Sequence, residues 1–480
     1  YPGASGPAIP YDVANSCRFE DGDTSYLQKT FSSGNRKTFT ISAWVKRSDL
    51  GRQQIIINTQ DDGSNQAGLQ FLAGDTLNFY SAISSTYYQL ITNRVFRDPS
   101  AWYHIVAHYD TTNSTSGDRI KLYINGVRET SFSTETQPSQ DYDTFWNQNT
   151  KKLSIGTYGD GAGLSYSGYM TEVVMVDGTA LDPTSFGEFD EDSPTIWKPK
   201  NVSGLTFGTN GFYLDFEDSS NLGNDANGGT DFTENNIAAT DQSTDTCTNN
   251  FATFNGVLGY NSTIALAEGN LKGTTGSTHE ALYGSIFSSI GVTQGKWYAE
   301  FKVTTNSDKS IIGISADMES DADGSDGSAF NFIYLGQGIG YYGNNGKIFH
   351  TDSNTQMTYG SAVSNNNIVG VALDVDNQEV YFSINGTFQN SGDPTSGSSK
   401  TGGVVNEGAR NIFSTGTGTI FFAVADFDRD ATCAIEANFG GGSVSAISSG
   451  NSDANGHGNF EYSVPSGYFA LCTKNLAEFG

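Results

Sequence analysis

The chain has few basic residues and no long apolar run, and each absence excludes a class of partner. It carries 25 Lys and Arg against 53 Asp and Glu, which gives a formal charge of −28. Binding of nucleic acid and docking on anionic lipid both need clustered Lys and Arg. Apolar stretches such as IFFAVADF have the length of a core strand and cannot span a bilayer. We therefore expect neither a nucleic-acid partner nor membrane insertion.

Cysteine is also scarce. The four cysteines, Cys17, Cys247, Cys433 and Cys472, are far apart and form no C-x-x-C pair. This spacing fits neither a zinc site nor a dense disulfide framework. Buried free thiols are the main expectation, and a Cys433–Cys472 disulfide stays open at this stage.

Glycine, tyrosine and phenylalanine are abundant, whereas charged residues make up only 16% of the chain, against roughly 25% in ordinary globular proteins. No segment has a sustained helical period of apolar residues, and short alternating stretches are separated by Gly-rich turns. The composition predicts an all-β protein whose surface is mainly Asn, Gln, Ser, Thr and Tyr. Such a surface is compatible with divalent cations and with neutral ligands such as glycans.

The tripeptide Ile-Asn-Gly occurs twice, each time between two strand-like stretches: KLYINGVRE with Asn125-Gly126, and VYFSINGTF with Asn385-Gly386. Asn-Gly readily adopts the two positive φ angles of a type I′ turn, so each copy predicts a β-hairpin. An aromatic-led or apolar strand precedes each copy in a similar series. The repetition predicts two tandem antiparallel β-sandwiches.

The expected organisation has four parts. Residues 1–16 form an N-terminal Pro/Gly-rich arm, and residues 17–197 form the first sandwich. Residues 198–250 are too poor in aliphatic side chains to form a core, so we expect a connector there. Residues 251–480 form the second sandwich with a C-terminal tail. The chain begins at Tyr1 rather than Met, so export cannot be judged from this end.

The first sandwich resembles the laminin-G/concanavalin-like jelly roll. The similarity lies in FTISAWVKR, AWYHIVAHYD, DRIKLYINGVRE, KLSIGTYGD and YSGYMTEVVMVDGTAL. In that family the last piece is the closing strand, which here contains Gly168-Tyr169 and the acidic Glu172.

The second sandwich resembles a SPRY domain. The matching pieces, GKWYAEFKV, SIIGIS, NNNIVGVALDVDNQEVYFSINGTF and AIEANFG, follow the order of that family from Gly295 to Gly440. SPRY domains are binding modules, so the resemblance implies recognition through loops at one end of the sandwich.

Two further segments, residues 208–246 and 464–476, are similar to segments in structural proteins of marine tailed bacteriophages. This resemblance implies a virion surface, and hence extracellular, location. It also implies other virion proteins as partners and a homo-oligomeric state.

One acidic stretch resembles a catalytic motif. EFDED, with Glu188, Asp190 and Asp192, is similar to the E-x-D-x-x-E pair of laminarinase-type glycosidases, in which two carboxylates face the sugar. Here the closing Glu is absent and a Ser-Pro pair follows directly, so we interpret the stretch as an exposed acidic turn. We expect no catalytic residues in the chain.

A second acidic stretch has the oxygen-only chemistry that calcium prefers. DADGSDG places Asp321, Asp323 and Asp326 in a Gly-rich loop, although an EF-hand would need Glu where Phe332 stands. The loop is a candidate Ca²⁺ site, with a solvated turn as the alternative. Asp61 and Asp62 form a weaker candidate of the same kind.

Histidine gives one suggestive pair, His104 and His108 in WYHIVAHYD. On a helix this spacing binds metal, but on a strand the two side chains are about 13 Å apart. We therefore expect structural roles for both.

Aromatic residues expected in loops are the preferred ligand-binding candidates, because aromatic faces stack on sugar rings and tyrosine adds a hydroxyl. The alternative for each is packing on a sheet face. The candidates are Tyr87, Tyr88, Tyr142, Trp146, Tyr341 and Tyr342.

These observations favour a non-enzymatic, fibre-like structural protein of a phage virion that attaches to host-surface glycan. A capsid decoration or head-fibre protein that stabilises the particle is the first alternative. A secreted polysaccharide-active enzyme is the second.

Overall fold

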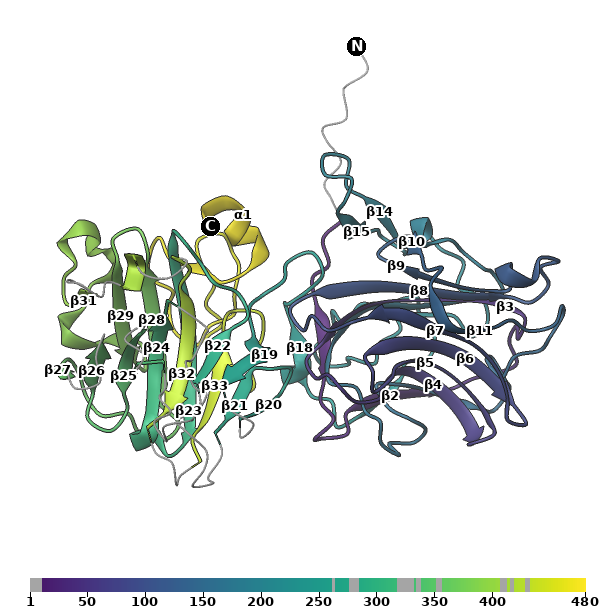
Figure 1. Ribbon diagram of the computed structural model, residues 1–480, viewed down its shortest axis with the longest axis horizontal. Coiled ribbons are helices and arrows are strands. Elements are labelled where there is room, and N and C mark those ends of the chain that lie inside the picture. The colour runs from purple at the N-terminus through teal and green to yellow at the C-terminus, as the bar shows by residue number, and fades with distance from the viewer. Residues whose placement is uncertain are drawn as a thin grey trace, which may run out of the picture. The chain divides into compact units, whose positions relative to one another are not determined.

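A computed structural model describes residues 11–260, 264–275, 285–316, 332–333, 338–350, 356–405, 412–414, 418–427 and 432–480. The chain divides into two compact units (Figure 1). The first comprises residues up to 242 except 98–100, together with 246–248. The second comprises 98–100, 243–245 and 249–480.

The first unit is built from two stacked antiparallel sheets (Figure 1). One runs in the order β10 (Val127–Arg128), β9 (Ile120–Ile124), β8 (Trp102–Asp110), β3 (Thr38–Arg47), β13 (Gly168–Asp177), β1 (Ser16–Phe19) and β18 (Gln242–Ser243), with β16 (Phe212–Leu214) also on β13. The other runs in the order β11 (Phe132–Thr136), β7 (Thr86–Val95), β6 (Thr76–Ile83), β5 (Asn65–Phe71), β4 (Gln54–Asp62), β12 (Lys152–Ile155), β2 (Tyr26–Thr30) and β17 (Thr233–Asn235). A separate hairpin pairs β14 (Gly187–Phe189) with β15 (Trp197–Pro199).

The core of the first unit lies between these sheets. Alternation along each strand sends every second side chain inward, as with Phe39 of β3 and Phe79 of β6. Both rings pack against Tyr109 and Trp146, with centroids 5.0–5.9 Å apart. This aromatic cluster joins the two sheets at the centre of the sandwich.

The expected connector differs from the structure over most of its length. Five of its apolar side chains are buried in the first core: Phe212, Leu214, Phe216, Leu222 and Phe232. β16 pairs with β13 and β17 pairs with β2.

Polar side chains of this segment form hydrogen bonds with buried backbone groups. The buried carboxylate of Asp225 accepts from the backbone N–H of Tyr213 at 3.0 Å and from Lys29 at 3.1 Å. A segment that is polar by composition therefore packs, because its Asp and Asn side chains bond to protein groups in place of water.

The first Asn-Gly turn has the predicted geometry. Asn125 and Gly126 have φ of 48° and 77°. The Asn125 side chain accepts from the backbone N–H of His104 at 2.8 Å. A Cβ on Gly126 would lie 2.4 Å from the ring of Trp197, so glycine alone lets that ring close over the turn.

The second Asn-Gly turn repeats this arrangement in the other unit. Asn385 and Gly386 have φ of 47° and 76°, and Asn385 Oδ1 accepts from the backbone N–H of Ile368 at 2.9 Å. Here the ring that closes over the glycine belongs to Tyr462, 2.5 Å from the position of a Cβ. Both predicted hairpins are thus confirmed.

The second unit also consists of two sheets, antiparallel except at β34. One runs in the order β19 (Phe254–Tyr260), β22 (Ser285–Ser288), β32 (Phe421–Asp426), β24 (Ser310–Ser315), β25 (Gly338–Tyr342), β26 (Lys347–His350) and β27 (Gln356–Thr358). The other runs in the order β20 (Ala265–Ala267), β21 (Lys272–Thr274), β33 (Ala434–Asn438), β23 (Lys296–Thr305), β28 (Ile368–Asp374), β29 (Glu379–Ile384) and β30 (Thr387–Phe388), with β31 (Val404–Val405) on β29 and β34 (Phe469–Ala470) on β23.

The C-terminal tail covers part of the outward face of the second of these sheets. Tyr298 of β23 and Tyr381 of β29 point away from the main core and pack with Phe460 and Tyr468 of the tail. The tail ends in helix α1 (Thr473–Phe479). Within the described ranges, no helix has the length and apolarity needed to cross a bilayer.

All four cysteines are free thiols. Cys433 and Cys472, left open as a pair by the sequence, are therefore not bridged. Burial raises the pKa of the Cys433 thiol to about 12, so the thiolate form is strongly disfavoured.

Candidate functional site

The outward face of the β11–β17 sheet in the first unit carries amide and tyrosine side chains at alternate strand positions. Leu69 and Phe79 point inward to the core, so their strand neighbours point outward. We name this side of the sheet the amide face. It is defined by three half-buried residues, Gln60, Tyr87 and Gln89, and by five buried ones, Asn58, Gln66, Gln70, Asn78 and Tyr80.

Strand register aligns these side chains in rows across the sheet. In one row Asn58, Gly68, Tyr80 and Gln89 are successive cross-strand partners. Gly68 leaves room there for the Tyr80 ring, which would lie 2.9 Å from a Cβ at that position. The next row includes Gln60, Gln66, Ala82 and Tyr87 in the same way.

Hydrogen bonds hold the centre of the amide face in place. The Tyr80 hydroxyl donates to Gln66 Oε1 at 3.0 Å, and Gln66 Nε2 donates to the Tyr87 hydroxyl at 3.0 Å. Gln66 Nε2 also donates to the Gly63 carbonyl at 2.8 Å. Tyr80 is buried whereas Tyr87 is half-buried, so this chain of bonds positions an accessible tyrosine from beneath.

The loop 156–165 closes one end of the amide face. The backbone N–H of Gly159 donates to Asn58 Oδ1 at 3.1 Å, and the Ser154 hydroxyl donates to the Gly159 carbonyl at 2.6 Å. Between this loop, Gln60 and residues 150–152 lies a cavity of about 430 Å³.

Charged groups at this cavity neutralise one another. Lys151 pairs with Asp61 at 2.6 Å, and Lys152 pairs with Asp160 at 2.9 Å. The cavity thus offers hydrogen-bond donors and acceptors without a net charge, the arrangement that suits a hydroxylated, uncharged ligand.

The structure separates the two neighbouring tyrosines predicted as ligand residues. Tyr87 lies on the amide face. Tyr88 points to the opposite side of the sheet, where it packs on the core and meets Tyr142 edge-on at 4.7 Å. Tyr142 is half-buried, and burial raises the pKa of its phenol. Consecutive strand residues face opposite ways, so Tyr87 and Tyr88 cannot serve one site.

The structure does not bring the other three aromatic candidates to a binding surface. Trp146 is fully buried, with its indole N–H donating to the Tyr80 carbonyl at 3.3 Å. Tyr341 is also buried, in the core of the second unit. Tyr342 points the other way on β25 and packs against Phe349 and Phe427. Polar neighbours in the sequence suggested loops, but sandwich packing decided these positions.

The acidic stretch with Glu188, Asp190 and Asp192 lies in and after β14, at the turn of the small hairpin. Asp190 accepts from the backbone N–H of Ser193 at 2.9 Å and pairs with Lys198 at 3.2 Å. These bonds, that of Ser193 first, lower the pKa of Asp190. Asp192 is exposed, so the stretch is the acidic turn that the sequence predicted.

Asp321, Asp323 and Asp326 lie outside the described residues, so calcium binding at this loop stays a prediction. In the other candidate, Asp61 pairs with Lys151, and Asp62 accepts from the backbone N–H groups of Ser64 and Asn65. The part of the chain that the structure describes holds no cluster of three or more His, Cys, Asp or Glu side chains suited to a metal ion.

Ser42 and His104 form a buried pair that resembles a nucleophile and its base. His104 Nε2 lies 2.8 Å from the Ser42 hydroxyl, but the indole N–H of Trp197 donates to His104 Nδ1 at 2.8 Å. The ring proton must then sit on Nε2, and burial lowers the pKa of His104 to about 3. Because Nε2 is a donor, it cannot take the serine proton. His108 packs separately, 3.1 Å from the Leu181 carbonyl.

Burial raises the pKa values of two carboxyl groups, which also anchor neighbouring segments through hydrogen bonds. Burial raises the pKa of Glu172 to about 7, and Glu172 accepts from the hydroxyls of Tyr213 at 2.8 Å and Tyr11 at 3.2 Å. Burial likewise raises the pKa of Glu300 to about 7, and two backbone N–H groups donate to its carboxyl group. Both groups hold structure together.

Sequence reasoning missed seven of the eight amide-face residues and identified Tyr87 alone. The signal was present in the spacing: Gln66, Gly68 and Gln70 alternate with the apolar Ala67 and Leu69, and Asn58 and Gln60 also stand two positions apart. Amides repeating at every second position along neighbouring strands predict one uncharged polar face.

Residues 21–184 match the sequence family described as the concanavalin A-like lectin/glucanases superfamily, of the Laminin_G_3 type. A comparison with curated proteins found no match.

Among solved structures, similar chains include the SPRY domain of human HERC1, with 13% identity, a TM-score of 0.27 and coverage of 38% of this chain and 96% of that one. Another is the SAP-like pentraxin of Limulus polyphemus, with 15% identity, a TM-score of 0.27 and coverage of 36% and 80%. A putative carbohydrate binding protein from Bacteroides ovatus has 17% identity, a TM-score of 0.30 and coverage of 47% and 59%. None of these three similarities bears on what this chain binds.

The expected fold class is confirmed: the protein is all-β, with two antiparallel sandwiches in tandem. Residues 21–184, which lie in the first of them, match the laminin-G/concanavalin-like lectin family.

Proposed function

We propose that this chain is a non-enzymatic structural protein of a virion surface that holds a neutral glycan on the amide face. The observation that carries the proposal is the uncharged set of amides and tyrosines aligned by register on one sheet face, with a cavity at its end. Amide groups both donate and accept hydrogen bonds, and so do sugar hydroxyls. The half-buried Tyr87 supplies an aromatic surface beside them.

One amide group at the cavity has spare bonding capacity. No donor in the described part of the chain reaches Gln60 Oε1, although its side chain lines the cavity. A buried carbonyl oxygen without a donor costs about 1–3 kcal/mol. A sugar hydroxyl bonded to a slightly rotated Gln60 would recover part of that free energy.

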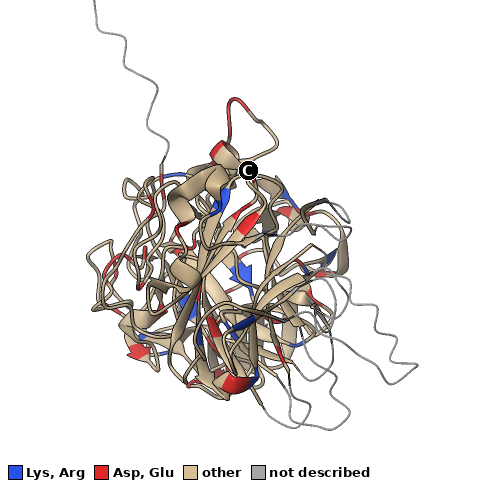
Figure 2. Cartoon of the chain, turned by 90° about the vertical axis from the view of Figure 1, so that its left-hand side faces the viewer, with Lys and Arg blue, Asp and Glu red and all other residues tan. Residues whose placement is uncertain are grey.

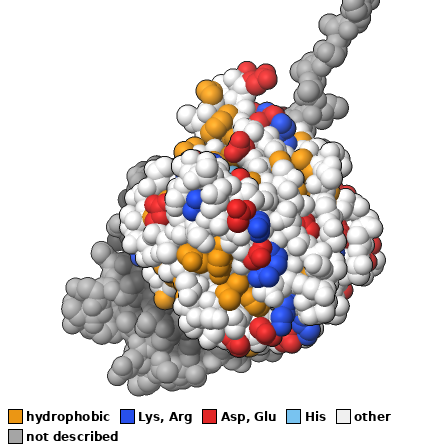
Figure 3. Space-filling model, turned by 90° about the vertical axis from the view of Figure 1, so that its right-hand side faces the viewer, with side chains coloured by type: hydrophobic (Ala, Val, Ile, Leu, Met, Phe, Trp, Pro, Cys, Tyr) orange, Lys and Arg blue, Asp and Glu red, His pale blue; other side chains and the backbone are white. Residues whose placement is uncertain are grey.

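Charge favours neutral over acidic sugars. The chain carries a formal charge of −28, and the two lysines at the cavity are already paired with aspartates. On the face drawn in Figure 3, most of the described surface is white, which marks backbone and side chains that are neither charged nor hydrophobic. A carboxylated or sulfated sugar would meet repulsion without a free cation to offset it.

Retaining or inverting hydrolysis needs two carboxyl groups on either side of the scissile bond. At the cavity, Asp61 and Asp160 are each paired with a lysine, and the hydrogen bond from Lys152 lowers the pKa of Asp160. A general acid must instead be protonated near neutral pH. This supports binding without cleavage.

The virion role rests on the resemblance of residues 208–246 and 464–476 to phage structural proteins. Weak contacts of single sites become tight when many copies on one particle engage a cell surface together. Host attachment is therefore the preferred role, and particle decoration is the alternative.

The test measures binding of neutral and acidic oligosaccharides to the purified chain by calorimetry. We expect a Kd near millimolar for a neutral ligand and at least tenfold weaker binding of an acidic one. Gln60→Ala and Tyr87→Ala should each weaken binding severalfold. Thr86→Ala, an exposed change on the same strand, should leave it unchanged.

Equal binding by all variants would place the ligand away from the amide face and overturn the proposal. New reducing ends in the same samples would instead favour the polysaccharide-active enzyme. Particles stripped of this protein separate the two structural roles, because normal adsorption combined with osmotic fragility would favour decoration.

A further inference from the structure

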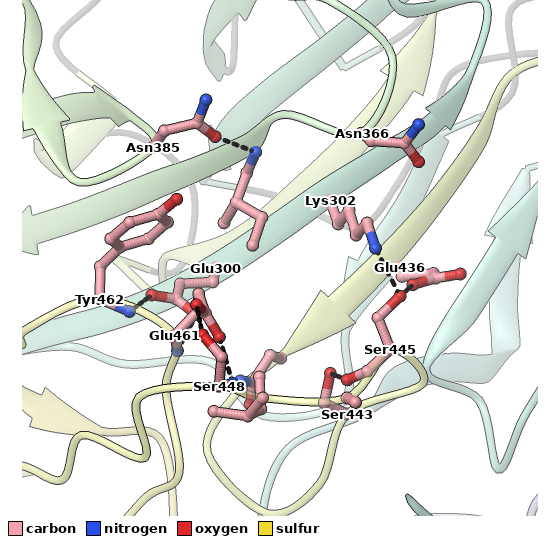
Figure 4. Close-up of a pocket in the computed structure, with 14 residues that line it drawn as sticks. Glu300, Lys302, Asn366, Asn385, Glu436, Ser443, Ser445, Ser448, Glu461 and Tyr462 are labelled. Carbon is pink, nitrogen blue, oxygen red and sulfur yellow. Dashed lines mark hydrogen bonds between the residues drawn. The ribbon is translucent and has the colours of Figure 1, made fainter.

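A second cavity lies in the second unit, on the outward face of the sheet that contains β23. Its volume is about 240 Å³. The floor includes Glu300 and Lys302 of β23 and Glu436 of β33 (Figure 4). Asn438 of β33, the cross-strand partner of Glu300, also lines the cavity. Residues of the C-terminal tail, among them Ser445 and Tyr462, lie over this part of the sheet and line the cavity.

The tail segments 443–448 and 461–462 form the wall, and Glu300 anchors that wall from below. Its carboxyl oxygens accept from the backbone N–H groups of Glu461 at 2.9 Å and Tyr462 at 2.8 Å, and from the Tyr298 hydroxyl at 3.1 Å. The Glu461 carboxylate in turn accepts from the backbone N–H of Ser448 at 2.7 Å. The wall is therefore held in a defined position before any ligand arrives.

The single cation of the cavity is engaged. Lys302 Nζ donates to the Ser445 hydroxyl at 2.8 Å, and that hydroxyl donates to Glu436 Oε2 at 2.6 Å. Three glutamates and one lysine line the cavity. Figure 2 shows acidic and basic residues spread over the described chain. An anionic ligand would therefore be repelled.

The rest of the lining combines amides with small apolar surfaces. Asn366 and Asn385 lie across the cavity from Ser445 and Ser448 (Figure 4). Ile368 and Ile447 supply apolar contact beside them. Polar groups of both kinds around a small apolar patch suit the hydroxyls and C–H faces of one sugar ring.

We propose that this cavity is a second saccharide site, which takes a single sugar residue without negative charge. It lies on different strands and in a different unit from the amide face. The chain would then carry two independent sugar sites, and this site does not depend on the first.

The test uses the full chain and ligand-observed NMR with three probes of similar size: glucose, glucosamine and glucuronate. To silence the amide face, all measurements are made in the Gln60→Ala, Tyr87→Ala background. We expect saturation transfer to glucose and glucosamine with Kd near millimolar, and at least tenfold weaker binding of glucuronate.

Two variants then locate the signal. Ala446→Trp, at an exposed lining position, fills the mouth and should weaken glucose binding at least tenfold. The matched control is Ser449→Trp in the same loop, which does not line the cavity and should change nothing. Glu436→Gln removes one charge at nearly constant shape and should bring glucuronate closer to glucose in affinity.

Melting curves confirm that each variant folds. Glucose binding that is unaffected by Ala446→Trp, or absent in this background, overturns the second site. Glucuronate binding as tight as glucose binding overturns the charge argument. If the wild type binds glucose and the Gln60→Ala, Tyr87→Ala background does not, the proposed function stands and this inference is rejected.

Discussion

At the scale of single residues, burial of a carboxyl group makes stability depend on pH. Glu172 has a positive φ of 50° in a bulge of β13 and is 4% exposed. Its pKa rises from 4.5 to about 7 because it is buried. The folded chain therefore binds a proton that the unfolded chain has released between these two values.

The sign of the effect follows from this linkage. The contribution of Glu172 to the free energy of unfolding is fully present below pH 4.5 and is lost as the pH rises through 7. We expect the unfolding free energy of the wild type to fall by about 3 kcal/mol relative to Glu172→Gln between pH 5 and pH 8. Urea denaturation of both proteins at the two pH values measures this difference.

Glu172→Gln also controls for the general repulsion among acidic groups, which grows with pH in both proteins. If the unfolding free energies of the wild type and Glu172→Gln change with pH in the same way, Glu172 is ionised in the folded state. Glu300 cannot be tested in this way, because both of its carboxyl oxygens accept from backbone N–H groups and a glutamine NH₂ would face a donor.

At the scale of elements, replacing the glycine of either Asn-Gly turn should destabilise only the unit that contains it, and by a similar free energy in both units. Gly126→Ala and Gly386→Ala each place a Cβ at positive φ and within 2.5 Å of an aromatic ring. The strain and the overpacking together should cost about 2–4 kcal/mol. Each change should lower the melting temperature of its own unit.

Two glycines serve as controls for the backbone strain alone. Gly51 and Gly467 have φ of 74° and 81°, with no atom within 4 Å of a Cβ. Alanine there should cost only about 1 kcal/mol. If the controls destabilise as much as Gly126→Ala and Gly386→Ala, the contacts with Trp197 and Tyr462 do not matter.

Strand alternation also explains which aromatic predictions failed. Tyr87 and Tyr88 are adjacent in sequence, yet one lies on the amide face and the other packs on the core. Residue type indicates that an aromatic side chain can stack on a sugar ring, whereas strand register decides which face of the sheet the side chain reaches. Trp146 shows the extreme case, since a tryptophan in a polar stretch became the centre of the core.

At the scale of the whole molecule, the unit boundary can be tested with fragments. A fragment of residues 11–242 should fold cooperatively, whereas one ending at 197 should not. The shorter fragment lacks Phe212, Leu214, Phe216, Leu222 and Phe232, whose burial contributes on the order of 10 kcal/mol. Circular dichroism and urea denaturation of both fragments would show the difference. Equal stability of the two fragments would instead support the domain boundary at residue 197 that the sequence suggested.

The sequence by itself determined the fold class, the two sandwiches and their two Asn-Gly turns. These properties depend on local patterns: strand alternation, glycine-rich punctuation and the φ angles that Asn-Gly tolerates. The tertiary structure alone decided that residues 198–242 complete the first core. It also decided that amides from four strands share one face and that two strand glutamates and one tail glutamate line a single cavity. Such groupings arise from contacts between residues far apart in the chain, and a local pattern carries no information about its distant partners.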